Sequence, residues 1–462
     1  MITGRLAEFA TGFADDAVPD AAIARAGDAL VDTLGVALAG SRHPVAALAR
    51  TIVPAIGEHE ASVWGGDGAK VRAGDAAFLN AVHTHALDFD DSSPALRGHP
   101  SCTLMPVAVA IGEATGASGR SVLASYAIGL EVASRISSAL GPGHYLHGWH
   151  TTVTAGIFGA TAIAGRLLGL DREALCRAFG LAASRASGLT RNFGTMAKPL
   201  HAGDAARAAI EAVHLARCGF TADAAILDGP QNFIAVYGRG GSPLTQDSLE
   251  SLGERWTIVA DGIFVKRWPC CYAVHRPVAA LQALIDETGL KKDEIVSVEV
   301  GFLPGVEHPL KHRAPTTGSE ARFSIEYAIA ATLLDGDLSL ASFADDQVRR
   351  PEAQALMARV RRFSIPHEGM FNGLTGFTEL VVETTAGTIR RRYERTPGSP
   401  EWPLSPDEQA AKFLGCAALA LDDREAHDLL GRARSVAGLA DIRALYDPVT
   451  TPASSPEPLA WN

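Results

Sequence analysis

Apolar residues recur at three- and four-residue intervals over much of the first half of the chain, which predicts a series of buried helices. The first run ends at Gly40 with Pro44 just beyond, and these residue types commonly mark the end of a helix. Asp171 is a residue type suited to the N-cap of a later helix. The predicted helices are Ala21–Gly40, Pro44–Ile56, Gly74–Ala86, Cys102–Thr115, Ser121–Leu140, Thr151–Leu168, Asp171–Ser187 and Ala205–Cys218.

The pattern changes after about residue 257, where β-branched residues begin to alternate with polar ones. Strands are predicted at Val296–Leu303 and Phe377–Glu383, and a hairpin turn at Thr384–Gly387 leads into a third, Thr388–Tyr393. Helices are predicted among and after them: Val278–Glu287, Phe323–Leu334, Glu352–Val360, Asp407–Leu419, Asp423–Val436 and Leu439–Tyr446. The Pro/Ser-rich end is predicted to be disordered.

This order of elements predicts a mainly α fold made of two domains. A large all-helical domain covers residues 1–264, and a smaller α+β domain covers 265–400. Helices resume in residues 401–462, and we expect this tail to pack back on the helical domain. The length of 462 residues suits two or three domains.

Composition and charge exclude several classes of function. The net charge of -11 and the pI of about 5.8 argue against nucleic acid or an anionic membrane as the main partner. No apolar run reaches the roughly 18 residues of a membrane span, and the N-terminus has no signal-peptide pattern. The six cysteines are scattered without a CxxC pair, which is typical of reduced, buried thiols. A soluble cytoplasmic protein is expected.

Polar residues of chemical interest gather between two apolar helices. The stretch His83–Pro106 (HTHALDFDDSSPALRGHPSCTLMP) contains three histidines, three aspartates and an arginine, with few large apolar side chains. Loops held by a rigid scaffold are frequent places for catalytic residues. An acidic surface loop is the alternative, and the added histidines favour a site.

Two further polar loops resemble the first because each ends where a helix is expected to begin. His99, His150 and Lys198 all lie at such starts. Free N–H groups and the positive end of the helix dipole make helix starts suitable for anions. If the three starts converge, they form a pocket for a small di- or tricarboxylate, but spacing alone does not fix that convergence.

Other chemistries are weakly supported. His83 and His85 could belong to a metal site, but residues two apart on a helix point their rings about 200° apart, and no HExxH motif is present. No metal is therefore expected. A G-x-S-x-G nucleophile motif is also absent, and Gly238–Gly241 lacks the surroundings of a dinucleotide site. His275 is either a core residue or part of a cleft between the domains.

Five motifs, in order along nearly the whole chain, resemble the MmgE/PrpD family: DFDD followed by HPS, then GWHTT, GTMAKPLHAG, WPCCYAVH and FSIEY. The resemblance implies a large helical domain with a smaller α+β lid domain. It also implies a homodimer and no required metal or organic cofactor. The chemistry it implies is formation or quenching of a carbanion next to a carboxylate.

The resemblance also implies site residues. The expected catalytic residues are Asp88, His99, His150, Lys198 and Tyr327, and the expected substrate-binding residues are Ser92, Lys266, His201 and His275. His99 would be the general acid/base, Lys198 would stabilise negative charge, and Tyr327 would donate from the lid. Ser92 replaces a threonine common in the family, and Ser93–Pro94 replaces a common tryptophan, which puts the substrate in question.

Three functions remain open. The first is a lyase: a dehydratase acting on a substrate like 2-methylcitrate, or a decarboxylase acting on one like cis-aconitate. The second is an epimerase of an imino- or amino-dicarboxylate such as iminodisuccinate. The third, a carboxylate-binding protein, is less consistent with the number of titratable side chains in the polar loops. Of these functions, we expect dehydration.

Overall fold

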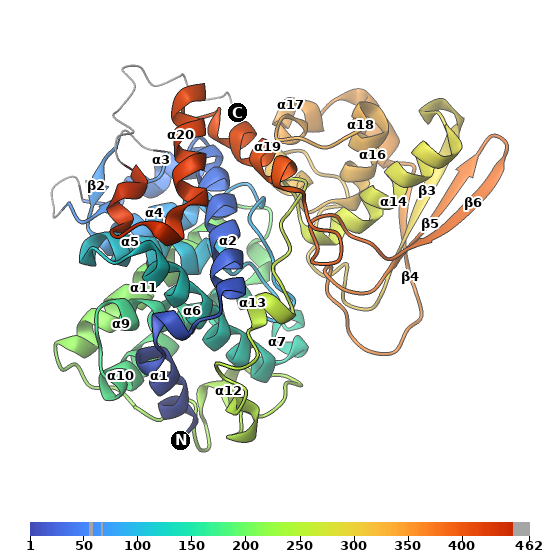
Figure 1. The fold of residues 1–462 in the computed structure, drawn as a ribbon. Helices are drawn as coiled ribbons and strands as arrows, with labels where there is room; N and C mark the ends of the chain where they lie inside the picture. Colours follow the sequence, from blue (N-terminus) through green and yellow to red (C-terminus); the bar gives the residue numbers. More distant parts are fainter. Residues whose placement is uncertain (55–58, 66–67, 447–462) are drawn as a thin grey trace.

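The computed structural model describes residues 1–54, 59–65 and 68–446. Figure 1 shows a large helical domain beside a smaller domain that contains a twisted sheet. The fold is mainly α with a smaller α+β domain, as the sequence predicts. Within the described ranges, no helix has both the length and the apolar character needed to cross a membrane.

The large domain is built from helices of the first 260 residues and two that return from the tail. They are α1 (Ile2–Gly12), α2 (Asp20–Gly40), α3 (Pro44–Arg50), α4 (Ala73–His85), α5 (Ser101–Thr115), α6 (Gly119–Leu140), α7 (Pro142–Leu146), α8 (Thr151–Thr154), α9 (Gly156–Leu167), α10 (Arg172–Ala183), α11 (Ala197–Arg217), α12 (Phe233–Tyr237), α13 (Thr257–Ala260), α19 (Pro406–Ala417) and α20 (Asp423–Arg434). A short ribbon joins β1 (Ala61–Ser62) to β2 (Lys70–Val71).

Small residues let the central helices of this domain approach closely. A Cβ added at Gly159 on α9 would lie 2.5 Å from the Gly129 carbonyl oxygen on α6. A Cβ at Gly203 on α11 would lie 2.7 Å from a Val82 methyl on α4. This explains the Ala- and Gly-rich helices: their contacts leave no room for larger side chains. The result is a rigid frame around the polar loops.

The smaller domain has a four-stranded sheet in the order β4-β3-β5-β6. Its strands are β3 (Ile295–Phe302), β4 (Val360–Ser364), β5 (Thr378–Thr384) and β6 (Gly387–Tyr393), and its helices are α14 (Tyr272–Thr288), α15 (Gly318–Ala321), α16 (Ile325–Asp335), α17 (Asp345–Val348) and α18 (Pro351–Met357). Strand β4 runs parallel to β3, and the other neighbours are antiparallel. Helices α14 and α16 contact the sheet, and alternate β3 residues such as Val298 and Val300 are buried in the domain core.

The C-terminal helices pack on α2 of the large domain. Phe413 of α19 fits against Gly35, where a Cβ would lie 3.0 Å from the phenyl ring. Beside it, the Lys412 ammonium is 2.6 Å from a carboxylate oxygen of the buried Asp32 and donates a 3.0 Å hydrogen bond to the Phe89 carbonyl. The tail therefore holds the polar loop that carries Phe89. The domain boundaries at 264/265 and 400/401 stay our proposal.

Several predicted elements differ in detail from the structure. The helix predicted over Thr151–Leu168 is interrupted at Ala155, so α8 and α9 are separate. Helix α11 begins at Ala197 rather than Ala205, which puts Lys198 inside its first turn. Strand β4 was not predicted, because its arginine-rich run lacks an apolar alternation. The helix predicted over Pro44–Ile56 already ends at Arg50, and the predicted disorder beyond 446 lies outside the described residues.

Replacing Lys412 with methionine should lower the free energy of unfolding by about 3 kcal/mol, because it strands the Asp32 carboxylate in a buried place. Chemical denaturation would measure this. The matched control is Arg267→Met. It removes an exposed 3.5 Å ion pair with Glu408, which lies on α19 like Lys412, and should cost less than about 1 kcal/mol. Equal losses in the two variants would contradict the structural role of Lys412.

Candidate active site

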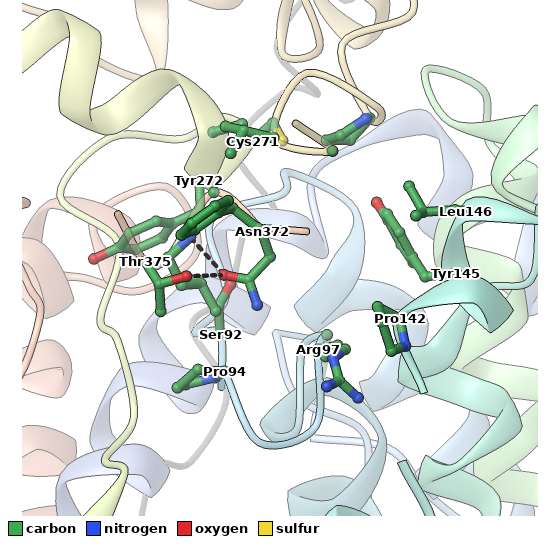
Figure 2. A pocket seen from close by; sticks show the side chains of 18 of the residues that line it. Ser92, Pro94, Arg97, Pro142, Tyr145, Leu146, Cys271, Tyr272, Asn372 and Thr375 are labelled. Atoms are coloured by element: carbon green, nitrogen blue, oxygen red, sulfur yellow. Dashed lines mark hydrogen bonds between the residues drawn. The ribbon is translucent and has the colours of Figure 1, made fainter. Parts of the chain in front are cut away.

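A cavity of about 300 Å³ lies between the two domains and is lined from both sides. The large domain contributes Ser92, His99 and His150, and the smaller domain contributes the start of α14 and the loop 370–375. Figure 2 shows the smaller-domain residues facing the large-domain residues across this space. Cys271 and Tyr272 lie at the start of α14, and Asn372 and Thr375 lie in the loop. The size is at the lower end for small-molecule sites and suits a compact acid.

Asp88 is the charged centre beside this cavity. The Lys198 ammonium contacts one carboxylate oxygen, and Lys266 lies 2.8 Å from the other while donating to the Asp88 carbonyl at 2.5 Å. Burial alone would raise the pKa of Asp88, but the two lysines outweigh it and hold that pKa well below its usual range. Burial also opposes the charge on Lys266, yet the attraction of Asp88 and Asp90 raises its pKa. Asp88 and Lys266 are therefore charged, and the Asp88 carboxylate is paired on both of its oxygens.

Backbone strain marks the same loop. Among the described residues, only three non-glycine residues have a positive φ, and two of them, Asp88 at 50° and Arg97 at 54°, lie between α4 and α5. Such conformations persist where the surroundings impose them, and they gather at functional sites. At Asp88 this conformation coincides with the contacts of both lysines.

His99 lines the cavity, and the hydrogen-bond partners of its ring indicate which nitrogen carries the proton. Its Nδ1 is 2.8 Å from the Asp91 carbonyl, 3.3 Å from an Asp90 carboxylate oxygen and 3.4 Å from the Ser92 hydroxyl. These are mostly acceptors, so we assign the proton to Nδ1, which leaves Nε2 with a basic lone pair. Burial lowers the pKa of His99 to about 3; Asp90 opposes the shift, and Lys266 and Lys198 add to it. The free site therefore holds a neutral imidazole.

Three more histidines continue from His99 into the large domain. The His85 ring lies 4.8 Å from that of His99 and stacks on His150 at 5.6 Å, and His150 Nδ1 is 3.3 Å from His201 Nδ1. Burial lowers the pKa of His150 well below its usual value, and neighbouring Lys198 adds to the shift. The buried Nε2 atoms of His85 and His150 have no hydrogen-bond partner among the described residues. These histidine side chains are thus neutral, and the Nε2 atoms of His85 and His150 each have an unpaired proton or lone pair.

The side chains of His85, Asp88, Asp90 and His99 also form a possible set of metal ligands. One ligand atom from each lies within 4.8 Å of the others. His83 does not belong to this set, because its Nδ1 is 3.0 Å from the Trp64 carbonyl, in line with the divergent rings predicted for the two helix residues. A cation here would have to displace the two ammonium groups that already neutralise Asp88.

The predicted site residues do not all reach the cavity. Ser92, His99 and His150 line it, while Asp88, Lys198, Lys266 and His201 lie directly behind them. The Lys198 ammonium lies 5.2 Å from the Phe193 ring and 5.4 Å from the Phe323 ring, and with Asp88 it lines a smaller pocket of about 20 Å³ rather than this cavity. We therefore place Lys198 as a support of Asp88 rather than as a direct contact of a ligand in this cavity.

Two predicted residues lie farther away. The Tyr327 ring packs on Phe343 in the core of the smaller domain, and its hydroxyl donates to the Ser342 carbonyl. The structure therefore does not bring Tyr327 to this cavity as a lid donor: its hydroxyl is used in the core. His275 is buried behind Tyr272, stacked on that ring at 4.6 Å, with Nε2 3.4 Å from the Cys270 carbonyl.

Some cavity residues were missed by sequence reasoning. Tyr145 lines the cavity from α7, and burial raises the pKa of its hydroxyl well above the usual value. Asn372 accepts from the Leu374 N–H and the Thr375 hydroxyl through Oδ1, and Figure 2 shows its amide nitrogen turned away from Thr375. No motif marks either position: Tyr145 lies in a glycine-rich stretch of the sequence, and Asn372 lies between a predicted helix and a predicted strand.

Neutral, buried histidines predict a loss of stability in acid. Burial lowers the pKa of His83, His144 and His201 to about 4 and that of His99 to about 3, against about 6.5 unfolded. Their contribution is complete above pH 6.5 and is lost as the pH falls toward 4, by about 1.4 kcal/mol per pH unit for each proton taken up on unfolding. Denaturation at pH 6.5 and 4.5 would measure the fall. His83→Gln should reduce this pH dependence, and an unchanged slope would contradict the assignment.

Comparison with known proteins finds a family model for each of two long parts of the chain. The family model of the MmgE/PrpD N-terminal domain matches residues 4–246, and that of the MmgE/PrpD C-terminal domain matches residues 268–434. The chain is 29% identical to the cis-aconitate decarboxylase of Homo sapiens over 96% of this chain and 93% of that protein. The enzyme of the same name from Mus musculus is also 29% identical, over 90% and 87%. A cis-aconitate decarboxylase of Aspergillus terreus (strain NIH 2624) is 24% identical over 98% and 97%. The chain belongs to the MmgE/PrpD family.

Proposed function

We propose that this protein is a carboxy-lyase that removes carbon dioxide from a small unsaturated tricarboxylate of the cis-aconitate type. Membership of the family, together with relatives named cis-aconitate decarboxylase, supports an enzyme of the decarboxylase or dehydratase type. The sequence motifs favour dehydration first, but the named activity of the relatives favours decarboxylation. The homodimer and the cytoplasmic location expected from the sequence stay predictions.

The observation that carries the proposal is the neutral His99 imidazole at the wall of the interdomain cavity. With the Nδ1 proton assigned to the Asp91 carbonyl, Nε2, which lies 3.9 Å from an Asp88 carboxylate oxygen, is the atom left to exchange a proton with a ligand. A bound polyanion would raise the pKa of His99, because its carboxylates offset the two lysines and the burial that keep the imidazole neutral. His99 would then be protonated in the complex and could deliver that proton.

Decarboxylation of an allylic tricarboxylate needs one proton at carbon. The bond from the CH₂ carbon to its carboxylate breaks, carbon dioxide leaves, and the electron pair forms a new double bond to the central carbon. The old double bond gives its electrons to the far carbon, which takes the proton from His99 Nε2. Negative charge develops on that carbon and its carboxylate, so preorganised positive charge lowers the barrier.

The remaining residues have supporting roles in this proposal. Lys198 and Lys266 keep Asp88 ionised and fixed, which positions the strained loop that carries His99. Ser92 offers a hydroxyl to a substrate carboxylate or to His99. His150, supported by His201, is a second proton-exchanging group at the cavity wall. His275 fixes the Tyr272 ring that closes the other side.

Incubating the protein in D₂O with cis-aconitate, 2-methylcitrate or iminodisuccinate, followed by NMR, would test this function. We expect cis-aconitate to lose carbon dioxide and the product to carry one deuteron at the protonated carbon. Water loss from 2-methylcitrate without decarboxylation would replace the proposal with a dehydratase. Deuterium exchange with inversion in iminodisuccinate would replace it with an epimerase.

His99→Gln should reduce kcat by about 10²-fold or more, because glutamine can hydrogen-bond but cannot transfer the proton. Wild-type protein should also take up close to one proton at neutral pH when it binds a tricarboxylate, and the variant should take up less. Calorimetry in buffers of different ionisation enthalpy measures that uptake. Equal proton uptake by both proteins would show that another group is the one that titrates.

A further inference from the structure

Arg97 is the one lysine or arginine among the described residues that line the interdomain cavity, and that lining contains no aspartate or glutamate. Figure 2 shows Arg97 beside Pro142, on the other side of the cavity from Cys271. Lys198 and Lys266 lie close by, but both are already paired with Asp88. The charge available to a bound anion at the cavity wall is therefore that of Arg97.

The guanidinium of Arg97 has few partners within the described part of the chain. Its single hydrogen bond to a described residue runs from Nη1 to the Ser137 carbonyl at 3.2 Å, and no carboxylate of the described residues forms an ion pair with it. Burial lowers the pKa of Arg97, with no acidic neighbour acting against the shift. A half-buried arginine normally has a carboxylate or phosphate partner, because desolvating an unpaired charge is costly. Four of its five N–H groups remain for a ligand.

The turn that carries Arg97 is built to hold it in place. Ser93 and Gly98 exchange two backbone hydrogen bonds of 2.9 and 3.4 Å, and the Ser137 hydroxyl donates to the Leu96 carbonyl at 2.7 Å. Arg97 has a φ of 54°, a conformation for which glycine or asparagine would be the usual choice. An arginine kept at a position that favours glycine points to a role for the side chain.

We propose that Arg97 forms a carboxylate-binding subsite that anchors a carboxylate of the substrate remote from the carbon that reacts at His99. The identity of the reaction rests on the proposed function, whereas the subsite rests on the cavity lining and the free guanidinium. A planar guanidinium matches a carboxylate with two parallel hydrogen bonds. This subsite selects tricarboxylates, because one carboxylate remains for Arg97 when the other two lie near His99 and the smaller domain.

A structural role is the competing explanation. Ser137 lies in the last turn of α6 (Gly119–Leu140), where a cation satisfies free carbonyl groups and the helix dipole. Under that explanation, removal of the side chain would lower thermal stability. Under our proposal, Arg97→Gly removes the ligand contact and also relieves the positive-φ conformation. Affinity for the ligand then falls, whereas thermal stability does not.

Calorimetry with tricarballylate, a saturated tricarboxylate that cannot react, tests the subsite directly. Arg97→Gly should weaken its binding by about 10- to 100-fold without lowering the midpoint of thermal unfolding. Arg97→Lys should bind with intermediate affinity, because an ammonium keeps the charge but loses the paired geometry. The matched control is Arg191→Met: Arg191 is exposed and does not line the cavity, so affinity should stay within about twofold of wild type.

Unchanged tricarballylate affinity in Arg97→Gly would overturn the subsite, as would no binding by the wild type. A loss of affinity together with a lower unfolding midpoint would overturn it in favour of the structural role. Turnover of cis-aconitate separates this proposal from the proposed function. If the wild type does not convert cis-aconitate but binds tricarballylate through Arg97, the reaction is wrong and the subsite stands. If Arg97→Gly converts cis-aconitate with an unchanged KM, the subsite is wrong and the function stands.

Discussion

The site depends on one buried ionic interaction, in which the Asp88 carboxylate lies between the Lys198 and Lys266 ammonium groups. The two lysines come from the start of α11 and from the segment before α14, so this interaction joins the large domain to the edge of the smaller one. Buried ion pairs are costly to form and are more often a means of fixing geometry than of gaining stability. Here they fix the strained loop between α4 and α5.

The same interaction sets the electrostatics of its surroundings. Positive charge from the lysines, added to burial, keeps His99 and His150 neutral in the free protein. Under the proposed function, a polyanionic ligand reverses that balance, so that its binding is coupled to protonation of His99. Arg97, with no acid to pair with, gives the cavity its attraction for such a ligand. The charged groups of the inner site are thus paired with one another, whereas Arg97 at the cavity wall is not.

Much of the fold could be predicted because it follows from local pattern. The spacing of apolar residues located helices such as α2 and α6 within two residues, and β-branched alternation located β3 and β5. Strand β4 was missed because Arg361 and Arg362 obscure its alternation, and only pairing with β3 defines it. The start of α11 was misplaced because Gly194–Asp204 has the composition of a polar loop, although its part from Ala197 onward forms the first turns of the helix and proline is tolerated there.

The sequence by itself determined the family: the motifs around Asp88, His99, His150 and Lys198 indicated it, together with a set of polar helix starts. The tertiary structure decided which of these residues reach the cavity, because burial and distance depend on packing between segments far apart in the chain. It placed Tyr327 in a core and Lys198 beside Phe193 but not in the cavity lining, and it brought Arg97 and Asn372 to the wall. Local pattern records what a residue is, whereas only the packed domains record what it faces.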